Sequence, residues 1–396
     1  MADCWVDSYV EQTDKVPSPK QFRLWSAITA ISGVLERKVW TTGAAGQIYP
    51  NLFTILVGPP ASGKTNAIKP IRELWSKISQ IHLSPDNVTK PALMDALSRA
   101  LRTVQLNNNE GVLNFSAMVV PCSEFGVFLS HHDLEFLSTI NHIYDSPASY
   151  KEERRISGVL EINKPHLVIL AGTQPDFLNS LLPEEAWGMG FTSRLIMIYA
   201  SQAPATDLFA KHSLKSLSMH PRLTQIAEMK GEFSWSEEAI REINAWNASG
   251  CPPAPTHNKL LYYNGRRALY VIKLSMIAAA ARTGTLHVTV DDYEKAKNWL
   301  LEAEVTMPDI FRSMGMRSDQ QVLTDLHYYL YSKWASLALD KRKPLTDQDL
   351  YEYLTTRVPS DKIQRIIETA EKTGYIKRAT YPGEWIPQPK GSFGTV

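Results

Sequence analysis

One stretch decides the fold of this chain: Ile55-Leu56-Val57-Gly58-Pro59-Pro60-Ala61-Ser62-Gly63-Lys64-Thr65. It fits the phosphate-binding pattern G-x-x-x-x-G-K-[ST]. An apolar, β-branched run over residues 52–57 precedes it and predicts a strand, and helical spacing of apolar residues over 66–79 predicts a helix after it. A glycine turn that fits the pattern by chance is the alternative. The flanking strand and helix are the context that the motif requires, and they favour a P-loop that binds a nucleoside triphosphate.

The backbone of this 58–65 loop suits a phosphate group. Glycines let the chain curl round an anion with its N–H groups pointing inward, and the following helix adds the positive end of its dipole. Lys64 can reach the β- and γ-phosphates, and the Thr65 hydroxyl can ligate magnesium. ATP and Mg²⁺ are therefore the predicted cofactors. The predicted nucleotide-binding residues here are Gly58, Pro59, Pro60, Ala61, Ser62, Gly63, Lys64, Thr65 and Asn66.

The acidic element that a P-loop ATPase also needs follows a strand predicted over residues 115–124. That strand ends in the polar pair Ser123-Glu124. A carboxylate at this place can hold the magnesium or deprotonate the attacking water, so Glu124 is the predicted catalytic base and metal ligand. Most such enzymes carry Asp-Glu here, and Ser123 leaves the second metal-ligand role open. A surface acid that caps the next short helix is the alternative for Glu124.

Two further strands are predicted downstream. Residues 164–174 are apolar up to a polar tip, Thr173-Gln174, and either residue can sense the γ-phosphate and help to hold the attacking water. Residues 195–200 form the next apolar run. Strands that alternate with helices predict a parallel sheet covered on both faces, which is an α/β fold class.

Arg194 stands directly before the last of these strands. In a P-loop ATPase, an arginine there can reach the γ-phosphate bound by a neighbouring subunit and stabilise transition-state charge as an arginine finger. A surface or salt-bridged arginine is the alternative. The finger interpretation explains an arginine among apolar and small residues, and it predicts a homo-oligomer.

A charged segment between the second and third strands is a candidate for contact with DNA. It comprises Tyr150-Lys151-Glu152-Glu153-Arg154-Arg155. In a ring-shaped translocating ATPase, an insertion at this point carries basic residues into the central pore. Lys151, Arg154 and Arg155 could then grip a phosphate backbone. A solvated turn is an equally good interpretation of such a charge run.

The chain as a whole predicts four regions. They are a prelude of a helix and a strand (1–50), a P-loop core (51–205), a helical lid (206–317) and a winged-helix-like domain (318–396). The main lid helix starts near Arg266 and Arg267, and one of them is expected to contact nucleotide, with surface pairing as the alternative. Lys377 and Arg378 would lie in the wing and could meet DNA phosphates. Winged helices also serve as packing modules, so this DNA contact stays open.

Length, net charge and cysteine content exclude few functions. A chain of 396 residues is long enough for two or three domains. The formal net charge of +1 neither favours nor excludes nucleic acid. Three scattered cysteines indicate neither a zinc site nor a disulfide framework, as expected in a reducing cytoplasm. No apolar run has the length of a membrane span, so no membrane contact is predicted.

Six short segments carry a resemblance to a known family. They are Ile48-Tyr49-Pro50-Asn51-Leu52, the loop Gly58–Thr65, Val88-Thr89-Lys90-Pro91-Ala92-Leu93, Ile143-Tyr144-Asp145, Ala171-Gly172-Thr173-Gln174-Pro175-Asp176-Phe177-Leu178 and Gly190-Phe191-Thr192-Ser193-Arg194. Over roughly residues 20–300 the sequence resembles phage and prophage P-loop ATPases of mobile-element replication modules, a primase–helicase-like group. More distantly, the Arg194 strand, the lid arginines and the terminal winged helix look like the AAA+ layout of MCM replicative helicases.

The resemblance implies an AAA+-type ATPase that assembles as a hexameric ring. Such a protein would act as a DNA helicase or translocase in replication, in the cytoplasm of a bacterial host and beside other replication proteins. Three alternatives stay open. The chain could be a helicase loader or replication initiator, a nucleotide-dependent switch, or a protein-remodelling ATPase.

Overall fold

The computed structural model divides the chain into two compact units, Met1–Phe311 and Arg312–Val396. They are called the N-terminal unit and the C-terminal unit below, and the three regions predicted before residue 318 fall almost wholly into the first. Among the described residues, no helix is long and apolar enough to cross a membrane. The residues that the structure describes are 4–85, 89–106, 111–128, 134–154, 158–182, 190–207, 216–336, 342–355, 358 and 360–388.

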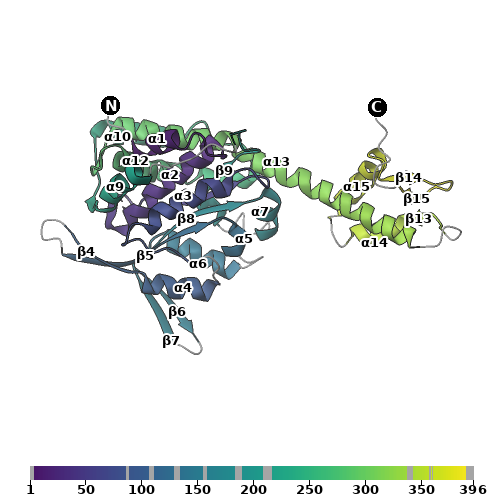
Figure 1. Cartoon of the computed structure of the whole chain (residues 1–396), viewed down its shortest axis with the longest axis horizontal. Helices are drawn as coiled ribbons and strands as arrows, with labels where there is room; N and C mark the ends of the chain where they lie inside the picture. Colours follow the sequence, from purple (N-terminus) through teal and green to yellow (C-terminus); the bar gives the residue numbers. More distant parts are fainter. Residues whose placement is uncertain are drawn as a thin grey trace. The chain divides into compact units, whose positions relative to one another are not determined.

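A five-stranded sheet forms the centre of the N-terminal unit (Figure 1). Its strands lie in the order β4-β5-β8-β3-β9, and all but β4 run parallel. The bounds of the parallel strands are β3 (Phe53–Val57), β5 (Val112–Cys122), β8 (Pro165–Thr173) and β9 (Leu195–Tyr199). This arrangement confirms the predicted parallel sheet of an α/β protein. It also sets β8 between the strand before the 58–65 loop and the strand before Glu124.

The strands are fixed in register by their buried apolar runs. Every residue of β3 and of β8 is buried, as expected for central parallel strands covered on both faces. Val57 pairs with Thr173 and with Tyr199, and Cys122 pairs with Ala171. The parallel strands therefore end together at one edge of the sheet, called the carboxyl edge here. They begin at the opposite edge, called the amino edge.

Helices cover both faces of this sheet. Figure 1 shows α2 and α3 on one face and α4, α5 and α6 on the other. The indole of Trp75 in α3 donates to the Ala30 carbonyl of α2 at 3.1 Å, which fixes the helix that follows the loop. The bounds are α2 (Lys20–Leu35), α3 (Lys64–Ser76), α4 (Lys90–Arg99), α5 (Phe125–Phe128), α6 (Leu134–Tyr144) and α7 (Pro175–Leu181).

Two β-hairpins differ from what the sequence indicates. The helical spacing of Leu93, Leu97 and Leu101 predicts a helix from Thr89 to about Leu106, but α4 ends at Arg99 and β4 (Leu101–Gln105) follows, antiparallel to β5. The helix prediction was wrong there because the segment alternates between exposed and half-buried residues, with the strand period of two. The charged segment is also a hairpin, β6 (Ser149–Arg154) with β7 (Gly158–Asn163). Both hairpins extend away from the body of the unit (Figure 1), so a simple solvated turn is excluded for residues 149–154.

The remaining helices of the N-terminal unit lie mostly within residues 206–317, where the sequence predicts helices. Helix α1, from the predicted prelude, packs with them, because the indole of Trp5 donates to the Met219 carbonyl of α9 at 2.9 Å. The helices are α1 (Trp5–Gln12), α9 (Ser216–Ala227), α10 (Glu237–Ala248), α11 (Leu261–Asn264), α12 (Arg267–Thr283) and the start of α13 (Val290–Ala335), with short 3-10 turns at Glu36–Lys38, Thr192–Arg194 and Asn258–Leu260. Two small sheets join them, built from β1 (Val39–Gly43), β2 (Gly46–Ile48), β10 (Gly231–Glu232), β11 (Ser234–Trp235) and β12 (His287–Val288).

The C-terminal unit has helices followed by a hairpin, in the order that the sequence indicates. Helix α13, which starts in the N-terminal unit, ends in this unit. The core includes Leu330, Leu350, Ile366 and Trp385. The other elements are β13 (Leu345–Thr346), α14 (Asp347–Leu354), α15 (Ser360–Lys372), β14 (Ile376–Arg378) and β15 (Glu384–Pro387), with the sheet order β13-β15-β14.

Candidate functional site

The 58–65 loop joins the end of β3 to the start of α3. Gly63 has a φ of 84° and caps the helix, and Ala61 also has a positive φ, of 61°. The ammonium group of Lys64 lies inside the loop and donates to the carbonyl oxygens of Gly58 and Pro59, each at 2.8 Å. The first N–H groups of a helix have no partner within the helix. The loop therefore combines a cation with a helix N-terminus, which suits the binding of a phosphate group.

The segment Pro17-Ser18 packs directly against this loop, although it lies far upstream in the sequence. A Cβ atom on Gly63 would lie 2.4 Å from the Pro17 carbonyl oxygen, so only glycine fits there. Asn66 donates to the same oxygen at 3.0 Å. Arg23 fixes the segment by donating from Nε to the Ser18 carbonyl at 3.2 Å. Part of the predicted prelude thus belongs to the surroundings of the loop.

The carboxyl edge brings Glu124 and Thr173 close to the 58–65 loop. The first amide of the loop donates to the Thr173 carbonyl at 3.1 Å, so the ends of β3 and β8 are joined. Gly172 permits a close approach from both sides, because a Cβ atom there would lie 2.7 Å from the Ser123 carbonyl oxygen and 3.3 Å from Cβ of Lys64. Glu124 follows Ser123 with an exposed side chain. Three elements that the sequence singles out therefore meet at one edge.

The two residues at the tip of β8 differ in accessibility. Thr173 is fully buried, and its hydroxyl donates to the Gln174 carbonyl at 3.4 Å. Gln174 is half-buried and stands at the N-cap of α7. Of the two predicted γ-phosphate sensors, Gln174 is the one whose side chain reaches solvent.

The donor types at this edge fit magnesium. Thr65 and Glu124 are both exposed, and a hydroxyl and a carboxylate are hard oxygen ligands. Mg²⁺ is usually bound by one or two such groups together with waters and substrate phosphates. Among the described residues, no group of three or more His, Cys, Asp or Glu side chains could hold a metal ion. An all-protein metal cage is therefore absent from this part of the chain.

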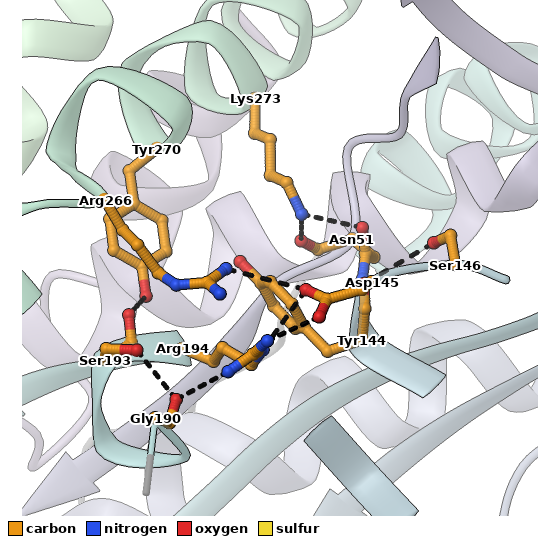
Figure 2. Close-up of polar contacts among 10 residues, drawn as sticks. All are labelled: Asn51, Tyr144, Asp145, Ser146, Gly190, Ser193, Arg194, Arg266, Tyr270 and Lys273. Carbon is orange, nitrogen blue, oxygen red and sulfur yellow. Dashed lines mark hydrogen bonds and ion pairs between the residues drawn. The ribbon is translucent and has the colours of Figure 1, made fainter. Parts of the chain in front are cut away.

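A second polar cluster lies at the amino edge, centred on Asp145 (Figure 2). Arg194 donates from Nε to one oxygen of this carboxylate at 3.2 Å and from a terminal nitrogen to the other. Its remaining terminal nitrogen donates to the Gly190 carbonyl at 2.8 Å. Arg266 forms an ion pair with the same carboxylate at 3.5 Å. Arg194 and Arg266, called the arginine pair below, therefore share one carboxylate.

The arginine pair cannot reach the 58–65 loop of its own chain. Arg194 precedes β9, whose first residue is level with Phe53 at the start of β3, and the loop begins only after Val57. At about 3.3 Å per residue, the length of β3 alone separates them by roughly 15 Å. Asp145 holds Arg266 at the same edge. The expectation that a lid arginine contacts nucleotide is therefore not met by Arg266 within one chain.

Arg267 has a structural role instead of the predicted one. Its side chain is fully buried and pairs with Glu304 in α13 through Nε at 2.8 Å and a terminal nitrogen at 2.6 Å. Its other contacts are the carbonyls of Cys251 and Pro253. Because its three nitrogens all bond within the helical region, Arg267 is the less suitable of the two arginines for contact with nucleotide.

A buried lysine, Lys273, lies next to the second cluster and contacts Asn51 and Tyr144. Lys273 of α12 donates to the main-chain and side-chain oxygens of Asn51, at 3.1 and 2.8 Å, and its nitrogen lies 4.1 Å from the centroid of the Tyr144 ring. Burial lowers the pKa of the Lys273 amine to about 7; Asp145 opposes this shift, and the arginine pair adds to it. Asn51 in turn donates to the Tyr144 carbonyl at 2.8 Å.

No motif or spacing in the sequence assigns a function to Asp145, Gly172 or Lys273. Asp145 lies in a segment that carries the family resemblance, but its partner Arg194 is 49 residues away. Gly172 does have a local signal, because a glycine interrupts an apolar strand just before a polar tip. Lys273 stands in an otherwise apolar helix, which is the signal that could have identified it.

The residues predicted to contact DNA in the β6–β7 hairpin are largely paired with acids. Arg154 pairs with Asp95 and with Glu152. Lys151 is exposed but lies 3.1 Å from Glu161 on the facing strand. Arg155 lies outside the described residues. Of the two described basic residues, Lys151 is therefore the one that solvent reaches readily.

The two predicted wing residues also differ. Arg378 donates to both carboxylate oxygens of Glu371, at 2.8 and 3.2 Å, and its guanidinium lies 5.6 Å from the Trp385 ring centroid. Lys377 is exposed. Tyr381, at 68% exposure, stands in the turn between β14 and β15. The wing therefore presents two exposed cations, of which Arg378 is paired with Glu371, and one exposed aromatic ring.

Comparison of the chain with protein-family models, and with curated proteins, found no match.

Proposed function

We propose that this chain is an ATP-hydrolysing motor of AAA+ type that assembles as a ring and moves or unwinds DNA in the replication of a phage or mobile element. One observation supports the proposal: the residues that suit the two halves of an ATPase site between subunits lie at opposite edges of the sheet. The carboxyl edge holds the 58–65 loop, Glu124 and Gln174. The amino edge holds the arginine pair, which faces away from its own loop.

At the carboxyl edge, each residue has a separate task. The loop backbone and Lys64 hold the phosphates, and Thr65 and Glu124 supply ligands to Mg²⁺, which neutralises phosphate charge when bound. Glu124 takes a proton from the attacking water, for which an exposed carboxylate is suitably accessible. Gln174 orients that water, since its amide both donates and accepts hydrogen bonds.

At the amino edge, the arginine pair serves a second copy of the chain. Roughly 15 Å of sheet separates it from its own loop, so it can reach a phosphate only across a subunit contact. A heterologous contact of loop edge to arginine edge repeats from subunit to subunit, and it closes as a ring when the rotation permits. This head-to-tail geometry supports a ring, and the hexamer remains part of the proposal.

Contact with DNA is assigned to Lys151 in the β6–β7 hairpin and to Lys377 in the wing. Both are exposed cations on projecting elements, which suits a phosphate backbone. Glu161 weakens the positive charge of the hairpin, so the hairpin is the smaller contributor. A loader or initiator that assembles on DNA without unwinding it is the second candidate, because the same two elements would serve it.

The Lys64→Ala variant should lose ATP hydrolysis, while the wild-type rate should rise with single-stranded DNA. The ammonium group lies inside the loop, and alanine leaves the phosphates without their cation. Steady-state phosphate release measures both effects. Lys69→Ala is the matched control, because Lys69 is an exposed lysine on the same helix. A wild-type rate of ATP hydrolysis that does not change with DNA would favour the nucleotide switch or the protein-remodelling ATPase. Stimulation of that rate by DNA, without separation of a forked duplex, would favour the loader.

The Lys377→Glu variant should weaken DNA binding and reduce its salt dependence. Each phosphate contact adds about 0.7 to 0.9 to the slope of log K against log salt, so the slope should fall by about 1. Fluorescence anisotropy over a salt series gives the slope. Arg241→Glu, with the same change of charge on the exposed face of α10, is the control. Equal losses in both variants would show a general charge effect and remove the wing from the interface.

A further inference from the structure

Asp145 forms ion pairs with both members of the arginine pair (Figure 2). Arg194 precedes β9 of the sheet, and Arg266 stands at the N-cap of α12 in the helical region. The carboxylate therefore joins a cation of the core to a cation of the lid. About half of its surface is exposed, at 48%, against 12% for Arg194 and 27% for Arg266.

Hydrogen bonds fix the backbone before and after Asp145. Asp145 follows the last residue of α6, and its N–H donates to the Asn141 carbonyl at 3.4 Å. Arg37 donates to the Ser146 and Pro147 carbonyls, each at 2.8 Å. The backbone that carries the Asp145 carboxylate is thus fixed by hydrogen bonds on both sides. A bidentate carboxylate on such a support also fixes the plane of the planar guanidinium that it holds.

The charges around Asp145 do not cancel. One carboxylate faces two guanidinium groups, and the amine of Lys273 lies behind Tyr144. The cluster keeps at least one net positive charge, so it still attracts an anion from outside. Asp145 can therefore hold the arginine pair without neutralising it.

We propose that Asp145 is a positioning residue, which sets the arginine pair in the geometry that acts on a phosphate bound by a second copy of the chain. The inference rests on the proposed function. Its physical basis is preorganisation, because an arginine that is already oriented loses little rotamer freedom when the phosphate arrives. The tie to Arg266 also makes this geometry depend on the lid. Tyr270 of α12 strengthens the tie by donating to the Ser193 carbonyl at 2.6 Å.

A subunit-mixing experiment tests the inference. The Lys64→Ala chain keeps its arginine pair but has a defective loop, and the Arg194→Ala chain keeps its loop but lacks the arginine. Each alone should be inactive, and a mixture should regain ATP hydrolysis where an intact loop meets an intact arginine. The Lys64→Ala chain, which supplies the intact arginine, is called the arginine donor, and the Arg194→Ala chain, which supplies the intact loop, is called the loop donor. Asp145→Ala is then added either to the arginine donor or to the loop donor.

In the arginine donor, Asp145→Ala should lower the kcat of the mixture roughly 10- to 100-fold, with the KM for ATP unchanged, as expected when a reacting group is misplaced by about 1 Å. In the loop donor, the same substitution should have little effect. Asp145→Glu in the arginine donor should restore part of the loss, because it keeps the charge. Asparagine has the same shape as aspartate but no charge, so the Asp145→Asn variant should fold normally and still lose activity.

Three outcomes would contradict the inference. Unchanged or increased activity with Asp145→Ala in the arginine donor would show that the carboxylate is a bystander or a competitor of the phosphate. Equal losses in both donors would show a purely structural role. An inactive parent mixture would overturn the proposed action between subunits, and the inference with it, whereas the first two results leave the proposed function standing.

Discussion

Replacement of Arg194 by alanine is expected to lower ATP turnover by at least about 10³-fold while ATP still binds. An arginine that stabilises transition-state charge from a neighbouring subunit contributes about 10³ to 10⁵ in kcat. Binding should survive because Arg194 lies at the amino edge, far from the 58–65 loop of its own chain. Equilibrium titration with a fluorescent ATP analogue, beside steady-state turnover, separates the two effects.

The control for Arg194 is another arginine that pairs with an aspartate. Arg282 donates to both oxygens of Asp292, at 2.8 and 2.7 Å, and Arg282→Ala removes that pair without touching the amino edge. Its turnover should stay near that of the wild type. Arg194→Lys should recover only a small part of the loss, because lysine keeps the charge but not the bidentate geometry. Wild-type turnover in Arg194→Ala would refute the finger and the ring built on it.

Lys273→Met is expected to remove a large pH dependence of stability. The pKa of Lys273 is about 7 in the folded chain and 10.5 without burial. Between these values the unfolded chain binds more protons, so wild-type stability should rise with pH. Over the whole window the gain amounts to roughly 5 kcal/mol, at 1.36 kcal/mol per pH unit. The amine is fully buried, so solvent screening reduces this figure little.

Urea unfolding at pH 7, 8 and 9 measures this effect. The free energy of unfolding of the wild type should rise relative to that of Lys273→Met by roughly 2 to 3 kcal/mol between pH 7 and pH 9. The loss of the two hydrogen bonds to Asn51 shifts the variant by a constant amount and leaves the slope informative. Parallel curves for the two proteins would show that the lysine keeps its ordinary pKa.

The sheet and its loop could be predicted because their signals are local. A P-loop motif fixes the loop and the helix after it, and buried parallel strands such as β3 and β8 are continuous apolar runs. Glu124 and Thr173 could be predicted for the same reason, as polar ends of such runs. That they lie together follows from the common direction of the strands.

The amino-edge cluster could not be predicted because it depends on tertiary contacts. Arg194, Arg266 and Asp145 come from three separate elements, and nothing in their neighbours along the chain indicates that they meet. The same limit explains Arg267, whose partner Glu304 lies in another helix. The sequence does not indicate the β6–β7 hairpin, because the charged residues of β6 replace the apolar pattern that usually marks a strand.

The packing of the N-terminus has a consequence for synthesis on the ribosome. Residues 5–18 leave the ribosome well before some of their partners are made, because Trp5 bonds to Met219 and Asp7 pairs with Lys295. Pro17 of the same segment packs against Gly63. Chains grow and fold from the N-terminal side. Residues 5–18 must therefore wait for partners that are made more than 200 residues later, so the nascent chain completes the surroundings of its own loop only after α9 and the start of α13 have left the exit tunnel.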